Sequence, residues 1–169
     1  MNAATRARKA PPSPGRFWLM KSEPDEVSVD DVLGMPDHKV AWFGVRNYQA
    51  RNFMRDAMQV GDGVLFYHSS CAEPGVVGIA EVASEAYPDP TQFDRKSDYY
   101  DAASKPDNPR WTLVDVAFTR KLKRTIGLAE LREQPKLEDF ALLRRGNRPG
   151  LTGTIPPRIG PASGPMAEW

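Results

Sequence analysis

The sequence predicts one α+β domain built on a curved, mixed β-sheet or barrel that is flanked by short helices. Apolar segments of strand length outnumber segments with helical spacing, and glycine in or beside the strands permits bends. No regular strand–helix–strand repeat is present, which argues against a doubly wound sheet. The length of 169 residues suits a single domain.

The first half of the domain alternates short strands with short helices. Residues 17–20 form an apolar strand that ends before Pro24, because proline removes a backbone donor. Ser28 is placed to cap a short helix, and residues 39–42 form the next strand. From residue 50 to residue 58 apolar side chains recur at the spacing of an amphipathic helix.

The second half continues with strands around one long connection. Residues 64–67 are apolar on both faces, which predicts a central strand, and residues 76–86 predict a long strand in which Gly78 permits a bend or bulge. Residues 87–109 are predicted as an irregular connection, and such long loops are often functional. The remaining predicted elements are a strand over 111–123 and a short helix over 128–133.

Composition excludes several classes of site. The formal net charge is only +1, so any contact with nucleic acid must come from local patches. Cys71 is the only cysteine, and His38 and His68 are the only histidines, so we expect no disulfide framework, no metal and no cofactor. The apolar runs are far shorter than the ~20 residues that cross a bilayer. We therefore expect a soluble protein, cytoplasmic in a bacterial cell and nuclear in a eukaryotic one.

Residues 42–53 (WFGVRNYQARNF) are the most informative segment, because they combine aromatic rings, a glycine, arginines and amides at the start of a predicted helix. Aromatic rings stack on flat ligands, amides read donor and acceptor edges, and arginine holds a phosphate or a carbonyl. The segment contains no nucleophile and no metal ligand. It therefore indicates a binding surface.

Together with other ordered motifs, this segment resembles the EVE domain family from about residue 17 to residue 148. The motifs are residues 18–24 (WLMKSEP), 42–53, 66–70 (FYHSS), 107–111 (DNPRW) and 114–116 (VDV). The resemblance implies a PUA-like fold and a cleft that binds modified bases in nucleic acid. It implies no reaction.

The resemblance divides the chain into three parts. Residues 1–16 are expected to be a disordered, basic, proline-rich tail, and residues 17–148 the EVE domain. Residues 149–169 are a divergent tail rich in glycine and proline, which resists both helix and strand. A frameshift and a genuine divergent tail both explain this change, and an intact frame in an independently isolated gene copy would exclude the frameshift.

Nine residues are candidates for the cleft, each with a structural alternative. Trp42 stacks on a base or packs in the core, Asn47 reads a polar edge or caps the helix, and Arg46 meets phosphate or forms a surface ion pair. For His68 the alternative is a buried, hydrogen-bonded ring. The candidate ligand-binding residues are Lys21, Ser22, Trp42, Val45, Arg46, Asn47, Tyr67, His68 and Ser69.

These residues predict a non-catalytic binding domain, and the resemblance implies that its ligand is nucleic acid, DNA or RNA, with a modified base such as a modified cytosine held in the cleft. A module for free nucleosides is the main alternative, and an enzyme acting on nucleotides is the third. Hydrolysis by His68 and Ser69 is disfavoured, because neighbours along a strand point to opposite faces. Steep salt dependence would separate binding of a polymer from binding of a free base.

Overall fold

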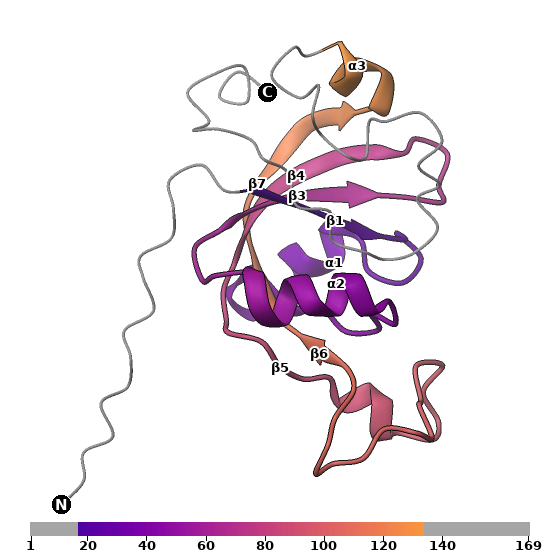
Figure 1. The fold of residues 1–169 in the computed structure, drawn as a ribbon. Coiled ribbons are helices and arrows are strands. Elements are labelled where there is room, and N and C mark those ends of the chain that lie inside the picture. The colour runs from indigo at the N-terminus through magenta and orange to yellow at the C-terminus, as the bar shows by residue number, and fades with distance from the viewer. Residues whose placement is uncertain (1–16, 134–169) are drawn as a thin grey trace, which may run out of the picture.

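The computed structural model describes residues 17–133, which form a curled sheet with short helices beside it (Figure 1). Strand β1 pairs in parallel with β3, and all other neighbours in this sheet are antiparallel, which confirms the predicted curved, mixed sheet. The five strands lie in the order β1 (Phe17–Ser22), β3 (Gly63–His68), β4 (Gly75–Val82), β7 (Asp115–Ile126) and β2 (Lys39–Ala41). The predicted tails over 1–16 and 149–169 lie outside the described residues.

Irregular pairing curves the sheet. The register between β4 and β7 shifts between Val76 and Gly78, and a Cβ added at Gly78 would lie 2.2 Å from the Phe118 ring. The predicted bend at Gly78 is therefore confirmed. The predicted strand over 76–86 was too long, because after Val82 the chain leaves the sheet and the Ser84 hydroxyl accepts the amide hydrogen of the neighbouring strand instead.

Short helices cover the sheet and begin at the predicted caps. Ser28 caps α1 (Val29–Leu33) in a capping box with Asp31, and Asn47 caps α2 (Tyr48–Asn52) by accepting the Ala50 amide. The predicted helix over 50–58 continues from α2 as a wider π-helical turn. The other short helical elements are η2 (Phe53–Ala57), α3 (Leu128–Arg132), η1 (Pro36–His38) and η3 (Pro90–Phe93).

Each face of the sheet carries its own hydrophobic core. Alternation along β3 sends Phe66 into the core beneath α1 and α2, and Tyr67 into the core that includes Leu131 of α3. β3 lies between β1 and β4, so the prediction of a central strand that is apolar on both faces is confirmed.

The predicted strand over 111–123 is divided at Val114. Its first part, β6 (Thr112–Leu113), pairs with β5 (Tyr87–Pro88) in a separate small sheet, whereas β7 pairs in the main sheet. The Val114 carbonyl between them accepts the amide hydrogen of Trp42. The chain therefore changes pairing partners at this residue.

The segment over residues 87–109, here called the 87–109 loop, is held in place by a buried glutamine. Gln92 donates two hydrogen bonds to the carbonyls of Asp89 and Trp111. It also accepts from the Ser104 hydroxyl and the Trp111 amide. A loop with little regular structure is thus tied to β6 by the complete hydrogen-bonding capacity of one side chain.

Candidate functional site

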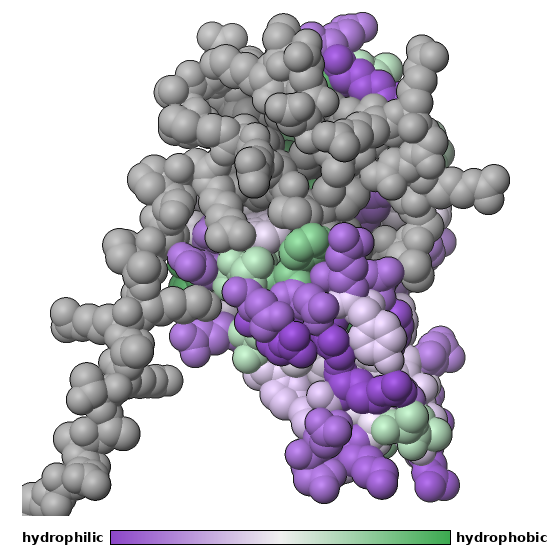
Figure 2. Space-filling view, viewed as in Figure 1, coloured by the Kyte–Doolittle hydropathy of each residue, from purple (hydrophilic) through white to green (hydrophobic). Residues whose placement is uncertain are grey.

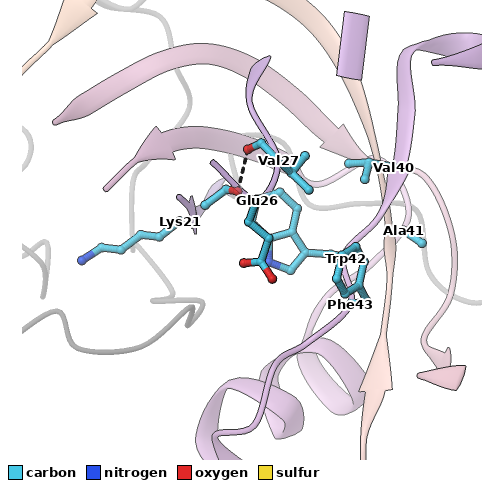
Figure 3. Close-up of a pocket in the computed structure, with 8 residues that line it drawn as sticks. Lys21, Glu26, Val27, Val40, Ala41, Trp42 and Phe43 are labelled. Atoms are coloured by element: carbon cyan, nitrogen blue, oxygen red, sulfur yellow. Dashed lines mark hydrogen bonds between the residues drawn. The ribbon is translucent and has the colours of Figure 1, made fainter. Parts of the chain in front are cut away.

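An open cleft lies between the end of β1, the turn that follows it, and β2 with the two residues after it (Figure 3). The empty space within it is about 300 Å³, a figure that includes the open solvent at its mouth. Its lining residues are Lys21, Ser22, Glu26, Val27, Val40, Ala41, Trp42 and Phe43.

Hydrogen bonds fix the turn that forms one wall of the cleft. The Ser22 hydroxyl donates to the Val27 carbonyl at 2.7 Å, and the amides of Glu26 and Val27 both donate to the Glu23 carbonyl. Ser22 is buried and lines the cleft, but its hydroxyl is used inside the turn. The turn places the Glu26 carboxylate and the Val27 side chain beside the cleft.

A tyrosine from the 87–109 loop holds the Glu26 carboxylate. The Tyr99 hydroxyl donates to Glu26 Oε1, while Glu26 Oε2 accepts no hydrogen bond from residues 17–133. Burial and then this hydrogen bond raise the pKa of Tyr99, so the phenol remains a donor. One carboxylate oxygen is therefore available to a ligand.

Trp42 belongs to the core and also lines the cleft. Only 7% of the residue is exposed, and its ring packs edge-on against Phe66 with centroids 5.2 Å apart. Beside it, Phe43 packs edge-on against Tyr99 at 5.8 Å. Trp42 thus packs in the core, and the same ring also forms part of the cleft wall, where stacking on a base stays a prediction.

Lys21 is buried, and it has no anionic partner among residues 17–133. Its residue is 3% exposed, and its Nζ lies 5.4 Å from the centre of the Tyr67 ring. In Figure 3 its amine points away from Trp42 and Phe43, so the alkyl stem lies nearer the cleft than the charge does. Burial lowers the pKa of Lys21 to about 8.

Arg46 braces the 87–109 loop rather than facing the cleft. The geometry assigns a protein acceptor to every N–H group of the guanidinium, which leaves no donor for the expected contact with phosphate. The acceptors are the carbonyl of Tyr99, which takes two bonds, the carbonyl of Val45, Asp89 Oδ2 and Thr91 Oγ1.

The carboxylate that pairs with Arg46 is itself fully buried. Asp89 Oδ2 lies 2.9 Å from Arg46 Nη1 and also accepts the Gly44 amide. Burial raises the pKa of Asp89, but hydrogen bonds from Thr91, Gly44 and Arg46 outweigh it and hold this pKa below its usual range. The ion pair is therefore part of the internal framework behind the cleft.

The other five candidates do not line the cleft. Val45 is buried in the core beneath α1 and α2, Tyr67 is buried in the other core, and the Oδ1 of Asn47 is engaged as the cap of α2. His68 Nε2 accepts the amide hydrogen of Val29 at 3.1 Å, and burial lowers the pKa of this histidine. Ser69 follows β3, and its amide donates to the Ser22 carbonyl.

Sequence reasoning missed the residues that complete the cleft: Glu26, Val27, Val40, Ala41 and Phe43. Phe43 lies within the motif over residues 42–53, and Glu26 lies two residues after the motif over residues 18–24. Nothing local predicts that Glu26 meets Tyr99, which lies 73 residues away.

Residues 17–133 contain no cluster of three or more histidine, cysteine, aspartate or glutamate side chains that could hold a metal ion. In the same part of the chain, no helix is long and apolar enough to span a membrane.

Comparison with known proteins identifies relatives over most of the chain. Thymocyte nuclear protein 1 of Homo sapiens is 50% identical over 124 residues, which is 68% of this chain and 55% of the human protein. The same protein of Danio rerio is 50% identical over 145 residues, covering 76% of this chain and 62% of the relative. This chain thus spans little more than half the length of the human relative.

Two solved structures share the fold. A protein from Pseudomonas syringae superposes with a TM-score of 0.75 at 45% identity, over 83% of this chain and 90% of that chain. Human THYN1, solved in complex with 5-methylcytosine-containing DNA, superposes with a TM-score of 0.74 at 43% identity, over 84% of this chain and 90% of that chain. The EVE domain model matches residues 16–154. With its PUA-like half-barrel, the chain therefore belongs to the EVE domain family.

Proposed function

We propose that this chain is a non-catalytic domain that binds nucleic acid and reads a modified base, of the modified-cytosine class, in the cleft beside Trp42. The observation that carries this proposal is a fixed carboxylate next to apolar walls. Tyr99 holds Glu26 through one oxygen and leaves the other available, while Val27 and Val40 line the same cleft.

This combination matches the chemistry of a methylated cytosine. A carboxylate accepts a hydrogen bond from the exocyclic N4 amine of cytosine, and apolar side chains favour contact with a methyl group at C5. The rings of Trp42 and Phe43 offer aromatic surface to a base that has left its stack. The cleft would thus contact three features of one ligand.

A relative supports the same ligand class. Human THYN1, which is 43% identical, is solved with DNA that contains 5-methylcytosine. By this relation we assign binding to residues 17–148, with 1–16 and 149–169 as flanking tails. The domain would act where its DNA lies, in the nucleus of a eukaryotic cell or the cytoplasm of a bacterial one.

The placement of the reactive side chains favours binding without covalent chemistry. The Ser22 hydroxyl donates to a backbone carbonyl, and His68 accepts a backbone amide hydrogen on α1. A nucleophile needs a base within hydrogen-bond reach, and these two side chains are each engaged with the backbone instead. We therefore expect no turnover of nucleosides.

The decisive experiment compares Glu26→Gln with Glu23→Gln, an exposed glutamate in the same turn. Binding to oligonucleotides that contain 5-methylcytosine or cytosine is measured by fluorescence anisotropy, in DNA and in RNA. Since the amide introduced by E26Q would place a donor where the carboxylate offered an acceptor, we expect this variant to lose about 1 to 3 kcal/mol of affinity for the modified strand. E23Q should bind normally. Equal binding by E26Q and the unaltered protein would remove the carboxylate from the site.

A free nucleoside is the second candidate ligand, favoured by the near-neutral formal charge of +1 and the small cleft. Its binding should be nearly independent of salt. Binding to a strand should weaken as salt rises, because each phosphate contact releases counterions.

A further inference from the structure

A second aromatic surface lies outside the cleft, at the start of α2. Tyr48 is 49% exposed, and its ring stacks on Trp111 with centroids 4.9 Å apart and planes inclined by 26°. Trp111 is buried and fixed by hydrogen bonds from its amide to Gln92 and from its indole N–H to Asp101. A half-exposed ring is therefore supported by an immobile one.

Two arginines lie beside this pair of rings. The guanidinium of Arg51 lies over the Tyr48 ring, 4.8 Å from its centre, and that of Arg110 is 6.0 Å away and pairs with Asp101 at 3.3 Å. Arg51 also donates to the Arg110 carbonyl at 2.8 Å, which connects α2 to the end of the 87–109 loop. Figure 2 shows that the surface over α2 is mostly hydrophilic. Two guanidinium groups and one carboxylate thus border the aromatic face.

The aromatic surface is connected to the cleft by side chains in contact. The Arg46 guanidinium lies 5.4 Å from the Trp111 ring and 5.5 Å from the Tyr99 ring, and Tyr99 packs on Phe43 in the cleft wall. Every step from Tyr48 to Phe43 is shorter than 6 Å. The aromatic surface and the cleft wall are therefore separated by only four side-chain contacts.

We propose that Tyr48, Trp111, Arg51 and Arg110 form a stacking platform for an unpaired base of the strand whose modified base enters the cleft. The proposal rests on the proposed function for the identity of this strand. Tyr48 offers its exposed surface to a base, and the two arginines attract the adjoining phosphates. Such stacking tolerates any base, so the platform adds affinity and no preference for the modification.

A nucleic-acid strand fits this surface better than an apolar protein partner does. The exposed neighbours of Tyr48 along the same helical segment are all polar: Gln49, Asn52, Arg55 and Asp56. The centres of protein interfaces are depleted in charged residues, whereas base stacking needs only the ring itself with cations nearby.

The test uses the variants Tyr48→Ala, Tyr48→Phe and Tyr100→Ala with single-stranded DNA that contains either 5-methylcytosine or cytosine. Y48A should weaken the affinity for both strands by about tenfold, which is within the range of loss found for single stacked bases. The ratio of the affinities for the two strands should not change. Y48F keeps the ring and should bind normally. Y100A removes another exposed tyrosine and should also bind normally, and thermal unfolding should verify that all three variants are folded.

The salt dependence provides a second readout. Arg110→Gln should reduce the slope of log affinity against log salt by about 0.7, the value for one phosphate contact on a single strand. Normal binding by Y48A, with the preference for 5-methylcytosine intact, would overturn the platform and leave the proposed function standing. If Y48A binds more weakly but the unaltered protein binds the methylated and unmethylated strands equally well, the proposed function is refuted and the platform is supported. No binding by the unaltered protein would refute both.

Discussion

Lys21 predicts a specific dependence of stability on pH. Burial lowers its pKa in the folded state to about 8 from the ordinary value of 10.5. Between these two pH values the unfolded chain binds more protons than the folded chain does, so this lysine makes the free energy of unfolding increase with pH. Below pH 8 both states carry the charge, and the folded state bears the full cost of burying it. That cost is about 3 kcal/mol, which is an upper value.

Replacing Lys21 by methionine removes the charge and keeps a side chain of similar length. Relative to the unaltered protein, K21M should be up to about 3 kcal/mol more stable at pH 7. By pH 9.5 this advantage should shrink by about 2 kcal/mol, because the unaltered lysine is then neutral in the folded state. Urea unfolding at both pH values measures the two differences.

The control for this experiment is Lys123→Met, since Lys123 is exposed on β7. Its free-energy difference from the unaltered protein should be the same at both pH values. If the K21M difference also stayed constant from pH 7 to pH 9.5, burial would not govern the protonation of Lys21, and the reasoning would be wrong.

Two further predictions concern the framework behind the cleft. Arg46→Met leaves the buried carboxylate of Asp89 without its cation and should lower the free energy of unfolding by about 3 kcal/mol, measured by urea unfolding. Limited proteolysis should then cut the 87–109 loop faster, and an unchanged cleavage rate would show that Arg46 does not brace it. Gly44→Ala should cost about 1 to 3 kcal/mol in thermal unfolding, because Gly44 has a φ of 82° and an added Cβ would lie 2.7 Å from the Tyr99 ring. A fully stable G44A would contradict this strain.

Features that depend on neighbouring residues could be predicted from the sequence. Ser28 and Asn47 cap their helices through backbone amides three residues ahead, so the side chain and its partner belong to one short segment. The central strand was also predictable, since β3 is apolar on both faces. Each of these signals is contained within a few residues.

The cleft was harder to predict because its side chains come from segments far apart in the sequence. For Arg46 the sequence left open a contact with phosphate and an ion pair. The carboxylate that Arg46 pairs with belongs to Asp89, which lies 43 residues away. His68 and Tyr67 share a motif with Ser69, yet alternation along β3 sends them to different surroundings. The residue types therefore indicated that the segment forms a binding surface. Which side chains line the cleft and which pack in the core could be seen only in the folded structure.

The hydrogen bonds of Gln92 have a thermodynamic consequence for recognition. Ordering a mobile side chain on binding costs about 0.5 to 1.5 kcal/mol, and ordering a whole loop costs more. Gln92 and Trp111 hold the 87–109 loop in the free protein, so Tyr99 already meets Glu26 before any ligand arrives. The loss of conformational entropy is thus incurred during folding. Recognition of the ligand that we propose should therefore approach rigid docking, in which nearly all the rearrangement falls on the nucleic acid as its base leaves the stack.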